Sequence, residues 1–195
     1  MLIRKKGFSF SKKEIKDLVK AWLVLSLAFA IVFNGLNFNI QFITAILICA
    51  ITVGTAFIFH ELGHKFTAQH YGCFAEFRSF DNMLFLALIL SFFGFIFAAP
   101  GAVMISGPIG KRRNGKISLA GPLTNMVLAV LFLIVHIYRP SVITSYGFII
   151  NTWIGLFNLI PFAMFDGKKI FDWNKTIYYV MITTGFLLLI VQGLI

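Results

Sequence analysis

The residues of this chain best suited to chemistry are two histidines and a glutamate in the pentapeptide HELGH at positions 60–64. His60 and His64 are four residues apart, so on an α-helix both imidazoles lie on one face and can reach one Zn²⁺. Glu61 between them can act as a base on water. The pentapeptide ends an apolar run at residues 42–59 that is long enough to enter a membrane. The sequence therefore predicts a metal site set in lipid.

The alternative, a polar helix end without a metal, is disfavoured by the cost of charge in lipid. A carboxylate inside an apolar span costs roughly 2.5–3.5 kcal/mol on insertion scales, so such residues are functional candidates. The chain has seven acidic residues, and of these Glu61 and Asp166 border long apolar segments. Both are therefore candidates for the metal site.

A third metal ligand must come from outside the pentapeptide, because a catalytic zinc usually has three protein ligands and one open position. His70 lies six residues after His64, off the shared helical face, and His136 lies at the far end of a later apolar segment. Asp166 is the better candidate because it follows an apolar helix and because Gly167 permits close backbone approach. An ordinary helix-ending Asp-Gly turn is the alternative at this position.

The composition is that of an integral membrane protein. Of the 195 residues, 59% are hydrophobic and 24 are phenylalanine, and the mean hydropathy is +0.90. The net charge of +10 could indicate nucleic acid binding, but no basic aromatic module is visible and no nucleic acid partner is expected. The two cysteines do not form a disulfide framework or a metal-type pair. The lipid bilayer is the expected surrounding.

We expect an all-α polytopic fold with about five membrane-spanning helices and a re-entrant or broken hairpin, which together account for six apolar segments. A short edge strand at residues 101–106 is an option within the hairpin. The six segments are residues 21–36 with a lead-in from 15, 41–68, 82–109, 118–138, 145–165 and 177–195. The basic N-terminal stretch is expected to be retained, because no small-residue cleavage site follows the first apolar run.

A parity argument supports the hairpin. If His60, His64 and Asp166 meet at one metal, the helices that carry them must end at similar depth. Both ligand groups are predicted at the C-terminal ends of their helices, so these helices run parallel and an odd number of crossings separates them. Residues 118–138 supply one crossing, so residues 82–109 must cross twice or dip in and return.

The distribution of charge gives an independent test, because cytoplasmic loops are rich in Lys and Arg. With a returning hairpin, every basic residue except Arg139 lies on the side of the N-terminus and of the metal site. A single crossing would divide the basic residues much more evenly. We therefore expect a multi-pass protein whose N-terminus and metal end face the cytoplasm.

Three motifs together resemble the site-2 protease family of intramembrane zinc metalloproteases. They are HELGH at 60–64, AGPLTN at 120–125, and NLIP at 158–161 followed by Asp166-Gly167. The resemblance covers residues 42–171 and implies that His60, His64 and Asp166 bind one zinc ion per chain and that Glu61 is the catalytic base. By the same resemblance Asn158 holds the substrate or the oxyanion. Many relatives carry a second glycine where this chain has Lys168.

The domain prediction is a basic cytoplasmic segment at residues 1–20 and a single transmembrane metalloprotease domain at residues 21–195, with a catalytic core at about 42–171. The expected activity is hydrolysis of peptide bonds within or near transmembrane segments of substrate proteins. Zinc is the expected cofactor, with no separate cofactor-binding residues. Substrate identity, cleavage position, gating, regulation and oligomeric state are not determined by the sequence.

Two further residues or segments have assigned roles with open alternatives. Asn125 is a second candidate donor to the oxyanion, and a polar contact between helices is an equally good interpretation. Residues 101–106 could offer a strand edge to an unwound substrate, and a plain loop or packing hairpin is the alternative.

Two rival functions remain at this stage. A catalytically silent metal-binding membrane protein would have a closed site of four ligands. A metal transporter would have ligands in both halves of the bilayer. The three visible ligands and the retained Glu61 favour the enzyme.

Overall fold

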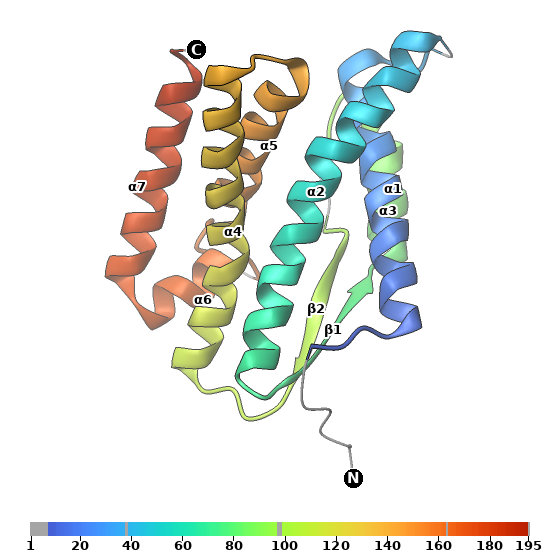
Figure 1. The fold of residues 1–195 in the computed structure, drawn as a ribbon. Helices are drawn as coiled ribbons and strands as arrows, with labels where there is room; N and C mark the ends of the chain where they lie inside the picture. The colour runs from blue at the N-terminus through green and yellow to red at the C-terminus, as the bar shows by residue number, and fades with distance from the viewer. Residues whose placement is uncertain (1–7, 38, 97–98, 163, 195) are drawn as a thin grey trace.

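The computed structural model describes residues 8–37, 39–96, 99–162 and 164–194. Within these ranges the chain forms a set of long helices with a small two-stranded sheet at one end (Figure 1). The helices are α1 (Lys12–Asn34), α2 (Ile40–His70), α3 (Asp81–Ser91), α4 (Lys111–Tyr138), α5 (Val142–Asn158), α6 (Asp166–Trp173) and α7 (Lys175–Gln192), and the strands are β1 (Phe74–Ser79) and β2 (Gly101–Ser106).

Three helices among the described residues, α2, α4 and α7, are long and apolar enough to cross a membrane. Large apolar side chains on these helices are exposed, for example Leu47 on α2, Leu131 on α4 and Phe186 on α7. Exposed apolar surface of this extent marks contact with lipid or with other proteins. The fold is consistent with a membrane protein, as expected from the composition.

The first two helices begin at side-chain caps. Ser11 accepts a hydrogen bond from the Glu14 backbone N–H, so α1 starts within the basic segment, well before the predicted apolar span. Asn39 caps α2 in the same way, with its Oδ1 2.9 Å from the Phe42 backbone nitrogen. Each cap satisfies a helical N–H that has no intrahelical partner. The two helices then pack against each other over most of their length (Figure 1).

The predicted strand at residues 101–106 is confirmed as β2. Its partner β1 lies after His70, between the predicted apolar segments 41–68 and 82–109, where the sequence predicted no strand. The strands are antiparallel, and Phe77 of β1 lies opposite Val103 of β2. The sheet lies beside the C-terminal half of α2 (Figure 1).

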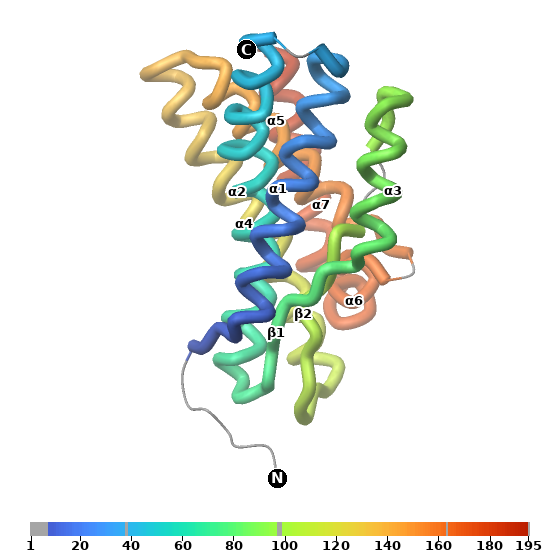
Figure 2. The backbone as a smooth tube through the Cα atoms, turned by 90° about the vertical axis from the view of Figure 1, so that its right-hand side faces the viewer, coloured from blue at the N-terminus to red at the C-terminus, as the bar shows by residue number. Residues whose placement is uncertain are grey.

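The segment between the two strands leaves the sheet and comes back to it. Helix α3 lies alongside α1 (Figure 2), on the opposite side of α2 from α4 and α7 (Figure 1). Its 11 residues rise about 16 Å, roughly half of a hydrocarbon core of about 30 Å. Helix α3 is therefore too short to cross a bilayer alone.

The second half of the chain departs from the predicted boundaries at one important place. The predicted helix over residues 145–165 ends at Asn158, and Asp166 is the first residue of a separate short helix, α6. Placing Asp166 at the C-terminal end of a helix was therefore wrong. Pro161 explains the break, because proline lacks a backbone N–H and disfavours helical geometry in the residue before it. A carboxylate in the first turn of α6 also complements the helix dipole.

The parallel arrangement that the parity argument required is nevertheless present. Helices α2 and α5 run in the same direction, and the end of α5 leads through a turn into α6 near the end of α2 that carries the histidines (Figure 1). The break after Asn158 changes the helix to which Asp166 belongs and not the end of the molecule at which it lies.

The cap of α2 gives a test of how this helix is anchored. Asn39→Ala removes the acceptor for the Phe42 N–H, and such losses typically cost about 1 kcal/mol. We expect a lower midpoint of thermal unfolding in detergent, measured by circular dichroism. Asn37→Ala is the matched control, because Asn37 is exposed and its amide makes only a long 3.4 Å contact with the Asn34 carbonyl. Equal midpoints for the two variants would contradict the assignment of the cap.

Candidate metal centre

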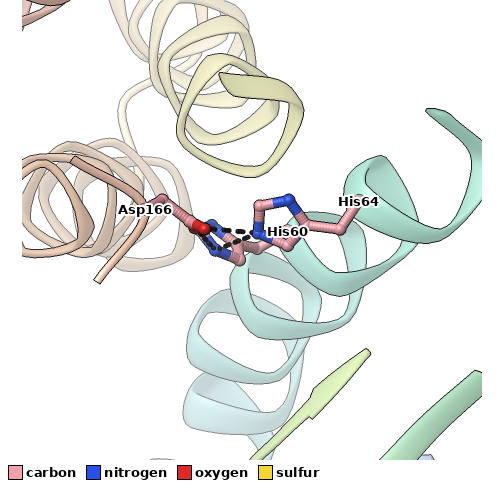
Figure 3. A group of neighbouring side chains, drawn as sticks. All are labelled: His60, His64 and Asp166. Atoms are coloured by element: carbon pink, nitrogen blue, oxygen red, sulfur yellow. Dashed lines mark hydrogen bonds and ion pairs between the residues drawn. The ribbon is translucent and has the colours of Figure 1, made fainter. Parts of the chain in front are cut away.

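Side chains from two distant parts of the chain converge at one end of the helices. The sequence predicts that this end faces the cytoplasm. His60 and His64 project from α2, and Asp166 comes from the start of α6 (Figure 3). The Asp166 Oδ2 atom is 2.9 Å from His64 Nε2 and 3.3 Å from His60 Nε2. The two Nε2 atoms are 3.0 Å apart, and all three residues are buried. The structure thus brings together the three residues predicted to meet.

The other nitrogen of each imidazole fixes its protonation pattern. His64 Nδ1 lies 2.7 Å from the Ile117 carbonyl oxygen, which can only accept a hydrogen bond. His60 Nδ1 lies 2.6 Å from Asn125 Oδ1, and the Asn125 amide nitrogen donates to the Ala56 carbonyl, which fixes the orientation of this amide. Both Nδ1 atoms are therefore donors, and in neutral imidazoles both Nε2 atoms present lone pairs.

Three such atoms at these separations repel one another unless a proton or a metal ion is shared among them. Two neutral imidazoles and a carboxylate form a common donor set for zinc. Ligand bonds of about 2.0–2.1 Å in a tetrahedral zinc site separate the donor atoms by about 3.3 Å. The observed separations of 2.9–3.3 Å are close to this value, so the three residues fit the ion. Three ligands leave the fourth tetrahedral position open.

Helix α4 approaches the imidazoles closely because residue 121 has no side chain. A Cβ atom on Gly121 would lie 2.3 Å from His64 Nε2 and 2.7 Å from His60 Nε2. The glycine of the AGPLTN motif therefore leaves the space in which the ligand atoms converge. In the sequence, Gly121 is visible only as part of the AGPLTN motif, since hydropathy does not show which side chains face it.

The start of α6 is held against the preceding turn at a second glycine. A Cβ atom on Gly167 would lie 2.0 Å from the Leu159 carbonyl oxygen, so only glycine permits this approach. The predicted close approach at Gly167 is confirmed. On its outer side, Asp166 Oδ1 lies 3.7 Å from Lys169 Nζ, while Oδ2 faces the histidines. The backbone contact and this ion pair together orient the carboxylate.

Glu61 lies one position from His60 and is also buried. Its carboxylate faces the backbone N–H of Val103 in strand β2. The candidate base therefore lies between the metal-binding cluster and the small sheet. This placement beside a strand is information that the helical pattern of HELGH does not contain.

The two candidate amide donors are found in different environments. Asn125 is fully buried, and its amide nitrogen donates to both the Ala56 carbonyl and Asn151 Oδ1, each at 3.0 Å. This is the polar contact between helices that was one of its two interpretations. Asn158 ends α5, and its amide nitrogen donates to the Ile154 carbonyl at 2.9 Å. Neither amide nitrogen is hydrogen-bonded to the histidines or to Asp166.

The remaining histidines lie outside the cluster, as the sequence indicated. His136 is bonded to the Thr144 hydroxyl at 2.9 Å, near the opposite end of α4. His70 packs edge-on against Tyr71 after the end of the metal-binding face. Asn151 is a residue that sequence reasoning missed. It extends the chain of hydrogen bonds from His60 through Asn125 into α5.

Comparison with known proteins agrees with this chemistry. A protein of Methanocaldococcus jannaschii named "Putative zinc metalloprotease MJ0611" is 42% identical in an alignment of 181 residues that covers 89% of the chain and 91% of that protein. The chain belongs to this zinc metalloprotease family. A second protein of the same organism, named "Zinc metalloprotease MJ0392", is 28% identical over 148 residues, or 73% of the chain and 38% of that protein. No family model and no solved structure matches the chain.

The space at Gly121 gives a test of the metal centre. Gly121→Ala places a methyl group among the ligand atoms, and we expect zinc affinity to fall by at least about 100-fold, the upper range for disturbing residues around a zinc site. Zinc content after purification and competition with a chelator measures this. Gly155→Ala is the matched control, because a Cβ atom there meets its neighbours at an ordinary 3.4 Å or more. Full zinc binding by Gly121→Ala would show that the ion lies elsewhere.

Proposed function

We propose that the chain is an intramembrane zinc endopeptidase of the site-2 protease type, which hydrolyses peptide bonds within or near transmembrane segments of other proteins. One observation carries the proposal. His60, Glu61 and His64 are buried in α2, a helix long and apolar enough to cross a membrane, and the two histidines lie next to Asp166. A metalloprotease site on such a helix is suited to substrates that are themselves embedded in lipid.

His60, His64 and Asp166 would hold one zinc ion per chain. When bound, this ion supplies a Lewis acid that polarises the scissile carbonyl and acidifies water. The Nδ1 hydrogen bonds of both histidines hold the rings so that Nε2 faces the site. Asp166 contributes one oxygen, and Lys169 stays near the other.

Glu61 is the proposed base. It takes a proton from the water whose oxygen attacks the carbonyl carbon, and it passes that proton to the amine nitrogen as the C–N bond breaks. Its position one residue from His60 keeps the carboxylate beside the metal ligands. Its burial keeps bulk water away, which strengthens electrostatic interactions in the site.

Substrate would bind as an extended strand at the outer edge of β2. A transmembrane helix has all its backbone groups paired internally, so its scissile bond must first be unwound. Strand β2 pairs on one side with β1, and the described residues place no third strand on its other side. The Val103 N–H on that side faces Glu61. A strand added there would bring its backbone to the base.

Asn158 and Asn125 would have separate roles. Asn158 ends α5 next to Leu159, whose carbonyl touches Gly167, so its amide lies near the turn that carries Asp166. An asparagine amide has two hydrogens, and with one donated to Ile154 the other can reach an oxyanion. Asn125 would orient His60, because both of its amide hydrogens are already engaged.

In the membrane we propose five spans, α1, α2, α4, α5 and α7, with α3 and β2 forming a hairpin that enters and returns. The N-terminus and the metal end would face the cytoplasm. Exposed basic side chains at the starts of α1 and α4 support this orientation. They are Lys12, Lys13, Lys16, Lys111, Arg112 and Arg113.

The rival functions have less support. A metal transporter needs ligands along a path, whereas in the described part of the chain His60, His64 and Asp166 form the one group of at least three potential metal ligands. A silent metal-binding protein has no need of a buried carboxylate next to the ligands. Membership of the zinc metalloprotease family also favours the enzyme.

The activity test is proteolysis in proteoliposomes with zinc and a panel of single-span substrate proteins. We expect cleavage by the wild type and a loss of about 100-fold or more in Glu61→Gln, since general acid–base groups contribute about 10²–10⁴-fold. Glu76→Gln is the matched control, because Glu76 is paired with Arg78 in β1 and is not part of the cluster. Equal cleavage by wild type and Glu61→Gln would reject the base, and zinc binding without any cleavage would support the silent protein.

The roles proposed for the two asparagines predict that one substitution weakens zinc binding and the other slows catalysis. Asn125→Ala should lower zinc affinity about 10–100-fold, because it removes the acceptor that orients His60. Asn158→Ala should retain zinc and lower kcat, on the order of 100-fold for loss of an oxyanion donor. Chelator competition and steady-state kinetics measure the two effects. The reverse pattern, with zinc lost in Asn158→Ala only, would overturn both assignments.

A further inference from the structure

A buried ion pair next to the metal centre is not used by the proposed reaction. Lys65 of α2 is paired with Glu14 of α1, and their exposed fractions are 1% and 0%. The Lys65 ammonium also lies 3.8 Å from the centre of the Phe10 ring. Lys65 directly follows His64, so this pair connects α1 to the metal-binding end of α2.

The same glutamate reaches the sheet. Glu14 Oε1 accepts a hydrogen bond of 2.9 Å from the Phe77 backbone N–H in β1. Phe77 lies opposite Val103, and its N–H is directed to Glu14 instead of to β2. Phe77 and Val103 are therefore a non-hydrogen-bonded pair, in which both N–H groups point away from the partner strand. Glu14 occupies the outer edge of β1 at this position.

The geometry of the pair directs the Val103 N–H to the opposite edge, and that is where Glu61 lies. Glu61 and Lys65 are four residues apart, so they are neighbours on one face of α2. These contacts link α2 to the sheet at two places. Lys65 forms an ion pair with Glu14, which accepts a hydrogen bond from the Phe77 N–H. Phe77 is paired with Val103, whose N–H faces Glu61. One helical face therefore reaches both edges of the sheet.

We infer that the Glu14–Lys65 ion pair is a positioning device that sets the strand edge of β2 beside Glu61, and that it closes the edge of β1 to added strands. Substrate strands are thereby directed to the edge next to the base. This inference rests on the proposed function. Glu14 and Lys65 touch neither the metal ligands nor the reacting atoms, so their effect passes through β1 and β2.

The choice of a charged pair fits this role. Burying two charges is expensive, and an apolar pair of similar size would often stabilise a fold equally well. A carboxylate, however, accepts two directional hydrogen bonds at once, here from an ammonium and a backbone N–H. It can therefore fix the positions of α1, α2 and β1 relative to one another more tightly than apolar packing alone can.

The test compares Glu14→Gln with the control Lys20→Met. Glutamine keeps an acceptor for the Phe77 N–H but removes the charge that pairs with Lys65. Lys20→Met breaks an ion pair of the same helix, with Asp81 of α3, that does not involve α2 and that meets β1 at its last residue, where the Ser79 hydroxyl donates to Asp81. For a single-span substrate that the wild type cleaves, we expect Glu14→Gln to raise KM about tenfold or more, because a displaced edge of β2 loses backbone hydrogen bonds to the substrate strand.

Two measurements distinguish a positioning role of Glu14 from a general loss of folded structure. Zinc content should equal that of the wild type, and kcat should change less than KM. If Glu14→Gln does not fold, the double variant Glu14→Gln/Lys65→Met removes the unpaired ammonium and should show the same raised KM with normal zinc content. A KM equal to that of Lys20→Met, or a loss of zinc and kcat without a change in KM, would overturn the inference. A wild type without zinc-dependent cleavage would instead refute the proposed function and this inference with it.

Discussion

The close approach of His60 Nε2, His64 Nε2 and Asp166 Oδ2 is the constraint on which the rest of the structure depends. Each atom presents electron pairs to the others at 2.9–3.3 Å, in a buried position. A shared cation removes the repulsion between these electron pairs, and a zinc ion would turn the arrangement into a set of bonds. The neighbouring elements serve to keep this arrangement in place, since two ligands come from one helix and the third comes from a segment about a hundred residues later.

Helix α4 supplies most of that support. It packs against α2, α5, α6 and α7, and so it lies between the two parts of the chain that carry the ligands. Its Ile117 carbonyl and Asn125 amide fix the two histidine rings, and Gly121 leaves the space in which their nitrogens meet. Packing and ligand orientation therefore come from the same helix, which explains why a segment without charged ligands carries a recognisable motif.

The small sheet brings a different requirement. Backbone groups in an apolar environment must be hydrogen-bonded, and a two-stranded sheet has two outer edges. At the Phe77–Val103 pair, Glu14 receives the N–H on one edge and Glu61 faces the N–H on the other. The first carboxylate is committed to an ion pair with Lys65, whereas the second belongs to the HELGH pentapeptide. The two edges are chemically different for this reason, because one carboxylate is held in an ion pair and the other lies beside the candidate metal ligands.

Local patterns in the sequence determined the HELGH helix and indicated the convergence of Asp166 with the histidines, and they left a strand at residues 101–106 as one option beside a plain loop. These follow from helical spacing, from hydropathy and from the cost of charge in apolar segments. Tertiary structure alone decided that α5 ends at Asn158 and that β1 pairs with β2. It also decided that the Asn125 side chain is hydrogen-bonded to His60 and that Glu14 forms an ion pair with Lys65. Each of these depends on which partner a side chain or backbone group finds across the fold, and spacing along one chain segment carries no information about that partner.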